Sequence, residues 1–174
     1  LRIIELILQE HNFGSILDGK PHYELVDNAF KTLSQDDPKS ILAAFAVGGK
    51  AGMKKEDVAQ EIGINIIALT KILKTLATGG IIAEKGGAAL AVQPKSFRHA
   101  LLKREFLSAD AYSNTDPYKR LFNVAVSKET ALQTLIGAIS KGGVIDEEWL
   151  IEQVQVLNST KIWNNLASVD EHFC

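Results

Sequence analysis

Residues 54–92 read KKEDVAQEIGINIIALTKILKTLATGGIIAEKGGAALAV, and this stretch decides the predicted fold. Its first nine residues place apolar side chains at helical spacing, which predicts a short helix. Gly63 supplies a turn, and Asn65 is a favoured residue for capping the start of a second helix. That second helix should begin at Ile66 and run to about Ala77, with leucines and isoleucines repeating on one face.

The second half of the stretch changes from helical to strand character. Gly79-Gly80 ends the helix, and IIAE (81–84) and ALAV (89–92) have the length and composition of two short strands. Lys85-Gly86-Gly87 between them is typical of a hairpin turn. Helix, turn, helix, glycine stop and hairpin in this order predict a winged helix-turn-helix, because several local rules agree.

The sequence before this stretch predicts three more helices. Residues 1–11 have apolar positions at helical spacing, and the polar, glycine-containing residues 12–20 follow as a loop. Pro21 suits the first turn of a helix that runs to about Leu33. Pro38 then opens the apolar helix SILAAFAV, which Gly48-Gly49 ends.

The sequence after the hairpin also predicts helices. Pro94 opens a helix through FRHALLKREFL, and the polar residues 109–116 before Pro117 mark a boundary. The remaining helices are expected at about 117–127, 129–140, 145–157 and 160–169. Short helices in tandem with short loops favour an antiparallel α-helical array.

The predicted fold class is therefore mainly α. It comprises a winged helix-turn-helix with one small β-hairpin, flanked by helices and followed by the antiparallel array. Three domains are predicted: a helical segment over 1–48, the winged helix-turn-helix over 49–108 and the helical array over 109–174.

Composition bounds the function classes. The 174 residues are 46% hydrophobic and carry a net charge of −2, which gives neither a strong field for nucleic acid nor a polybasic membrane signal. The one cysteine, Cys174, allows no internal disulfide, so a reducing cytoplasm is expected. No apolar run reaches the roughly 20 residues that span a bilayer. The first residue, Leu1, already belongs to a helical pattern, so we expect the chain to come from a longer protein.

The second helix of the predicted helix-turn-helix bears on DNA binding. Such a helix enters the major groove and contacts base edges through residues near its N-terminus. Those contacts need hydrogen-bonding side chains, whereas this helix begins with Ile66, Ile67 and Ala68. We therefore interpret these three residues as an interaction surface for another domain or chain.

Few cations accompany the predicted helix-turn-helix. Lys71 and Lys74 on its second helix and Lys85 in the wing are the candidates for contacts with a DNA backbone. The preceding helix carries an acidic cluster, Glu56, Asp57 and Glu61, which opposes DNA binding because it repels phosphates. The composition thus disfavours nucleic acid as a partner, and DNA binding is the first alternative.

No catalytic or metal-binding pattern emerges. GSILDGKP (14–21) nearly matches a phosphate-binding loop, but Pro21 stands where that loop needs a hydroxyl and an N–H group. The four histidines lack metal-ligand spacing, and no Cys/His or Ser/His/Asp set can be assembled. We expect a protein that is not an enzyme by itself, with no metal and no cofactor of its own.

Residues 96–106 read SFRHALLKREF, which resembles the F-R-H-x-L-L-R-E signature of STAND-class signal-transduction ATPases. In that family the signature follows the hairpin of a winged helix. LRIIELILQE (1–10) looks like the end of their helical lid, and residues 21–49 look like the segment that leads from lid to winged helix. The resemblance covers about residues 1–107.

The resemblance implies a regulatory role. In the family, an upstream nucleotide-binding core holds ADP and the winged helix packs on that core, so ATP or ADP is implied for the full-length protein. A histidine at the position of His99 approaches the ADP β-phosphate, which makes His99 the candidate for nucleotide sensing, with Arg98 beside it. Ala100 stands where the plant members of the family have an Asp. The alternative is that His99 only packs within its helix.

The leading hypothesis is a non-catalytic regulatory and protein-interaction module of a larger signalling NTPase. Its expected partners are the upstream core of the same chain and a protein bound by the helical tail. The alternatives are a DNA-binding winged-helix regulator and a helical scaffold that recruits partners without a nucleotide link. Burial or exposure of His99 should help to separate the scaffold from the nucleotide sensor.

Overall fold

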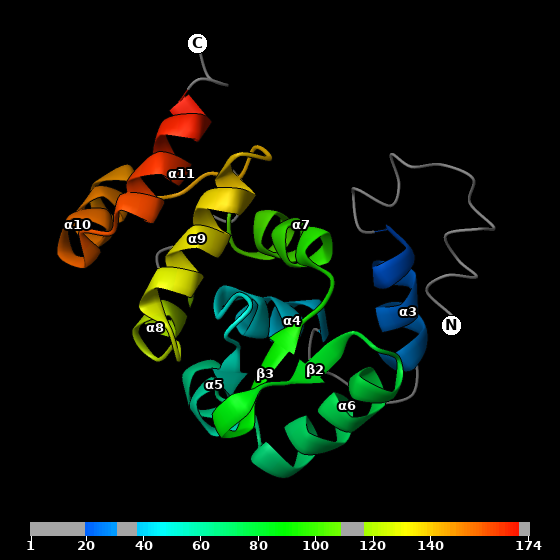
Figure 1. Cartoon of the computed structure of the whole chain (residues 1–174). Helices are drawn as coiled ribbons and strands as arrows, with labels where there is room; N and C mark the ends of the chain where they lie inside the picture. The colour runs from blue at the N-terminus through cyan, green and yellow to red at the C-terminus, as the bar shows by residue number, and fades with distance from the viewer. Residues whose placement is uncertain (1–19, 31–37, 109–116, 171–174) are drawn as a thin grey trace.

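The computed structural model describes residues 20–30, 38–108 and 117–170. These residues form nine α-helices and one three-stranded antiparallel sheet (Figure 1). The mainly α class is therefore confirmed. The predicted helix 1–11, most of the GSILDGKP loop and Cys174 lie outside the described residues.

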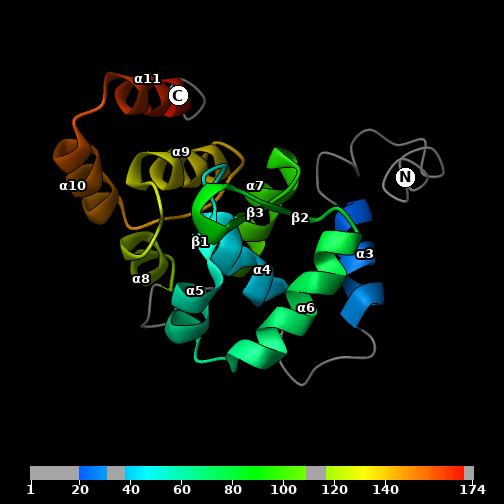
Figure 2. The ribbon, with the colours of Figure 1, turned by 60° about the horizontal axis from the view of Figure 1, so that its bottom comes forward.

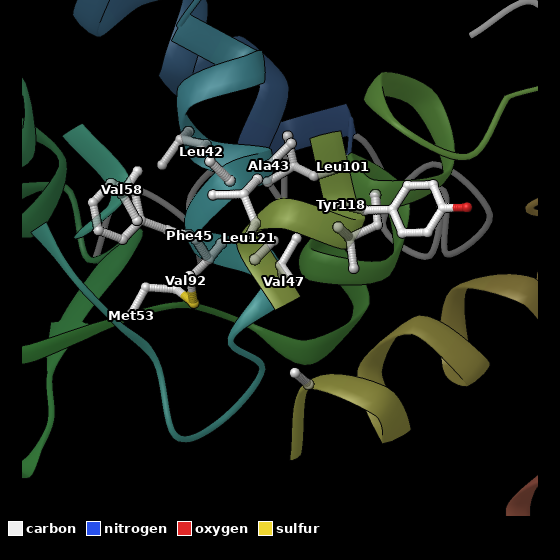
Figure 3. Packing of buried hydrophobic residues seen from close by; sticks show 14 of the residues in the cluster. Leu42, Ala43, Phe45, Val47, Met53, Val58, Val92, Leu101, Tyr118 and Leu121 are labelled. Atoms are coloured by element: carbon white, nitrogen blue, oxygen red, sulfur yellow. The ribbon is translucent and has the colours of Figure 1, made fainter. Parts of the chain in front are cut away.

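Helix α4, Pro38–Val47, forms the centre of the molecule. All seven residues from Ile41 to Val47 are at most 4% exposed, because ILAAFAV is apolar on every side and a helix of that kind must be buried all round. α3, Lys20–Phe30, and α7, Lys95–Glu105, both pack on α4. Figure 3 shows Leu42 and Phe45 of α4 within this core.

The helix pair α5, Lys55–Ile62, and α6, Ile66–Thr78, follows the predicted geometry. Gly63 ends α5 in the left-handed conformation, with φ 70°. The Asn65 side chain accepts hydrogen bonds from the backbone N–H groups of Ile67 at 2.8 Å and Ala68 at 3.4 Å, so it caps α6. The predicted turn residue Gly63 and the predicted capping residue Asn65 are both confirmed.

The sheet corrects the predicted single hairpin. β2, Ile82–Glu84, pairs with β3, Ala89–Val92, as expected, but a third strand, β1, Met53–Lys54, pairs with the other edge of β3. The strand order is β1-β3-β2. A strand of two residues has no alternating pattern, which is why the sequence did not indicate it and Lys54 was assigned to a helix.

Gly52 explains how the third strand comes so close to β3. Its φ is 81°, and a Cβ atom there would lie 2.6 Å from the carbonyl oxygen of Leu90. Only glycine combines this backbone conformation with this approach. The connection between β2 and β3 contains a short 3₁₀ turn, Gly86–Ala88, with positive φ at Gly87 and Ala88.

Four helices follow α7: α8, Pro117–Asn123; α9, Lys128–Ile139; α10, Glu147–Leu157; and α11, Thr160–Asp170. The sequence predicted all four, although α8 ends at Asn123 rather than near 127. Among the described residues, none of the helices combines the length and apolar character required to cross a bilayer.

Helix α9 is the main connection between these helices and the rest of the molecule. It packs on α7 and α4 on one side and on α11 on the other (Figures 1 and 2). α10 is fixed to α8 through Trp149, whose ring meets the Tyr118 and Phe122 rings edge to face at 5.3 and 5.2 Å. Asp146 caps α10 and forms a 2.6 Å ion pair with Lys119. The domain boundaries at 48 and 108 stay predictions.

Candidate functional site

The start of α6 presents apolar side chains to solvent. Ile67 is 66% exposed and Ile66 is 37% exposed, and Ala68 beside them is also exposed. The buried face of α6 is formed instead by Leu69, Ile72, Leu73 and Leu76. The two isoleucines therefore lie outside the core-facing stripe, and burying them on a partner would be favourable.

A surface depression of about 450 Å³ lies beside the exposed isoleucines. Helix α4 contributes Ser40 and Ile41, and the end of α5 together with the turn that leads to α6 contributes residues 61–65. Ala68 of α6 lies on the same wall. The opposite part of the lining comes from Phe106, after α7, and from Pro117 and Arg120 of α8. Segments far apart in the sequence thus form one depression next to the predicted interaction surface.

The charges around α6 are mixed. Lys71 and Lys74 are exposed on α6, and Lys85 is exposed beyond the end of β2. The three lysines lie on two separate elements. α6 contains no acidic residue, whereas Glu61 at the end of α5 lines the depression. The contact of these lysines with a DNA backbone stays a prediction.

Arg98 has a structural partner. Its Nη1 donates a 2.7 Å hydrogen bond to the carbonyl oxygen of Val92, at the end of β3. Burial lowers the pKa of the guanidinium, and its Nε has no hydrogen-bond partner in the part of the chain that the structure describes. Arg98 therefore fastens the sheet to α7 in this arrangement. Its participation in nucleotide sensing stays a prediction.

His99, the next residue of α7, is also buried and is only 5% exposed. Its imidazole lies against Gly137 of α9, where a Cβ atom would approach the ring to 2.6 Å. Burial, followed by the charges of Lys95, Arg98 and Lys141, lowers the pKa of His99 to about 4. His99 is thus neutral at physiological pH and faces α9 rather than open solvent.

A second buried histidine, His22, connects α3 to α7. The His22 ring stacks on Phe97 with ring centroids 4.9 Å apart, and the Tyr23 ring meets Phe97 edge to face at 5.2 Å. Burial lowers the pKa of His22, and among the described residues neither of its ring nitrogens has a hydrogen-bond partner. The Arg104 guanidinium lies over the Tyr23 ring, 4.7 Å from its centroid.

The two buried histidines predict that acidification destabilises the fold. Both have folded-state pKa values below 6.5, so below about pH 6.5 the unfolded chain binds more protons than the folded chain. The stabilisation that each provides is fully present above about pH 6.5 and is lost as the pH falls through its folded-state pKa, which for His99 is about 4. Each histidine contributes a slope of at most about 1.4 kcal/mol per pH unit.

Urea unfolding between pH 7.5 and 5 measures this slope. We expect the free energy of unfolding to fall as the pH decreases. His99→Gln should reduce the slope by up to one proton, because the variant lacks one of the two buried imidazoles. A stability that stays constant between pH 7 and 5 would contradict the burial of both imidazoles.

The structure brings together only part of the predicted site. Ile66, Ile67 and Ala68 share one helical turn beside the depression, whereas Arg98 and His99 lie on α7 within packed surfaces. Sequence reasoning missed Phe106 and Arg120, which line the depression. No local pattern could have indicated them, because only the folded chain places them beside α6. Among the described residues, no group of three or more potential ligands could hold a metal ion.

Comparison with known proteins provides no relative from which a function could be transferred. No protein family, curated protein or solved structure matches the chain. The surface around α6 and the buried residues of α7 are therefore the features from which a function can be inferred.

Proposed function

We propose that this chain is a non-catalytic protein-interaction module of a larger signalling NTPase. The start of α6 would contact the nucleotide-binding core. The observation that carries the proposal is the exposure of Ile66 and Ile67, at 37% and 66%, in the first turn of α6. Exposed β-branched apolar side chains at this place favour contact with another protein surface.

The arrangement of elements supports a winged helix-turn-helix as the framework. α4, β1, α5, α6, β2 and β3 follow one another along the chain, and the sheet has the order β1-β3-β2. α5 and α6 are joined by the short turn around Gly63, and the hairpin follows α6 directly. This order places α6 at the surface, where a helix-turn-helix presents its second helix.

The chemistry of α6 argues against sequence-specific DNA recognition. A helix in the major groove reads base edges through side-chain donors and acceptors. The exposed first turn offers Ile66, Ile67 and Ala68, which can provide only apolar contacts. Binding in the groove would also bring the carboxylate of Glu61, at the preceding helix end, towards the phosphates.

One observation favours DNA binding as the second candidate. Lys71 and Lys74 are both exposed on α6, which carries no acidic residue. Two lysines on the outer face of a helix can contact phosphates without reading sequence. Such binding would be weak and would depend strongly on salt concentration.

The burial of His99 bears on the proposed link to nucleotide. The imidazole faces Gly137, so contact with a nucleotide would require α9 to move away from α7. This packing favours the alternative of a helical scaffold without a nucleotide link. The resemblance of residues 96–106 to the STAND signature supports the nucleotide link, and the ADP dissociation rate of full-length protein with His99→Ala would separate the two.

The contact through α6 can be tested by amide hydrogen exchange in the full-length protein and in this chain alone. We expect the amides around the start of α6 to be more protected in the full-length protein. Ile66→Glu with Ile67→Glu should remove this protection and weaken docking at least tenfold, because two partly buried isoleucines contribute roughly 2–3 kcal/mol. Val126→Glu is the control, because Val126 is 50% exposed but lies outside α6.

Two results would contradict the proposal. Unchanged protection in the double variant would exclude the start of α6 as the contact surface. Fluorescence anisotropy with random-sequence duplex DNA at about 50 and 200 mM salt tests the second candidate. Micromolar binding that falls steeply with salt and is lost in Lys71→Gln with Lys74→Gln would favour DNA binding instead.

A further inference from the structure

We infer that the depression beside α6 is an anchor site for an apolar side chain of a protein partner, on a segment whose carboxylate pairs with Arg120. This inference rests on the proposed function, because it assigns a partner chemistry to the same surface. The inference extends the proposed contact surface from Ile66 and Ile67 to the depression and to Arg120.

The shape and lining of the depression suit a large apolar side chain. Its volume of about 450 Å³ lies within the usual range of ligand pockets. Apolar groups come from Ile41, Ile62, Ile64, Phe106 and Pro117. Ile41 is buried and the other four are half-buried, so this apolar surface is partly covered but still accessible. A leucine or phenylalanine side chain could remove that surface from water.

The depression is continuous with the exposed start of α6. Asn65 and Ala68 line it, and Ile66 and Ile67 occupy the same helical turn between them. A partner that covers the two isoleucines therefore extends over the mouth of the depression. This continuity favours a protein segment as occupant, because a free small molecule would leave the isoleucines exposed.

The charges select the kind of segment. Arg120 is exposed on the rim and forms no ion pair with any residue that the structure describes. A guanidinium pairs well with a planar carboxylate, and α6, which contributes to the lining, carries the exposed Lys71 and Lys74 and no acidic residue. Glu61 on the same lining repels a dianion such as a phosphate group about twice as strongly as a single carboxylate. A segment with one acidic group beside an apolar anchor fits this arrangement.

An NMR titration tests the site with a small probe. The probe is N-acetyl-L-phenylalanine, which carries an apolar ring and one carboxylate, and its neutral comparison is N-acetyl-L-phenylalaninamide. With the ¹⁵N-labelled chain, we expect saturable shifts at the amides of Gly63, Ile64 and Ala68. The Kd should be about 1–10 mM for a fragment of this size, and the amide should bind at least threefold more weakly.

Two variants and a control identify the contacts. Arg120→Gln should make the acid and the amide bind equally, because the variant lacks only the charge that distinguishes them. Ala68→Leu should reduce binding of both probes by filling the wall of the depression. Lys50→Gln is the control, since Lys50 is exposed and does not line the site. A well-dispersed spectrum shows that each variant is folded.

Three outcomes would overturn the inference. The first is the absence of saturable shifts around Gly63 up to about 20 mM probe, which is above the expected Kd range. The second is equal binding of the acid and the amide to the unmodified chain. The third is a micromolar Kd for the free probe. The last would point to a small-molecule site. The proposed function fails separately, through hydrogen exchange at Ile66 and Ile67, so probe binding without docking would retain the pocket and reject the proposed function.

Discussion

Gly49→Ala should lower the free energy of unfolding by about 2–5 kcal/mol, because two costs add. Gly49 has φ 61°, a left-handed conformation that alanine adopts with strain. A Cβ atom there would also lie 2.3 Å from Oγ1 of Thr134 and 2.8 Å from the carbonyl oxygen of Thr130, both on α9. Moving the Thr134 side chain relieves only the first contact, since the second is with backbone.

Gly63→Ala is the matched control for this variant. Gly63 has φ 70°, but no atom lies within 4 Å of a Cβ built on it. Its substitution should therefore cost only the conformational strain, about 1 kcal/mol. Urea unfolding at pH 7.5 measures both variants. Equal losses for the two would show that α9 does not pack tightly on the turn after α4.

Gly137→Ala should also destabilise the chain, by about 1–2 kcal/mol, although alanine is normally the better residue in a helix. Gly137 lies inside α9, where alanine would contribute up to about 1 kcal/mol of helix propensity. That gain is outweighed because a Cβ atom would lie 2.6 and 2.7 Å from Cε1 and Nε2 of His99. The imidazole must then leave its position between α7 and α9.

A double-variant cycle separates this clash from other effects. His99→Ala leaves space at the interface, so adding Gly137→Ala to that variant should be neutral or stabilising. The effect of Gly137→Ala on the free energy of unfolding should thus be negative when residue 99 is histidine and zero or positive when it is alanine. If Gly137→Ala destabilises equally in both backgrounds, the ring does not lie against Gly137.

The parts of the fold that local rules govern were predictable. Gly63 ends α5 through its left-handed conformation, and Asn65 begins α6 through its side-chain cap. Both effects act within a few residues, so the local sequence indicates them. β1 was not predictable, since its two residues are strand only by virtue of pairing with β3. Its approach depends on Gly52, whose role appears only when Leu90 is beside it.

The candidate site, too, was predictable from the sequence only in part. The apolar character of Ile66 and Ile67 could be interpreted from their place in the helix, because the core-facing stripe of α6 lies elsewhere. The depression beside them could not, as Phe106 and Arg120 reach it only through tertiary packing. For His99, the sequence left both sensing and packing open, and the side that the ring faces depends on a glycine in α9.

The close contacts at Gly49 and Gly137 should make α9 a rigid connection between the elements that pack on it. A helix that touches a neighbouring turn and ring this closely cannot slide in small increments, because packed interfaces move between discrete positions. A pull on α11, which packs on α9, would therefore reach α4 and α7 without being absorbed in between. α4, α7 and α11, which all pack on α9, should therefore shift together with it.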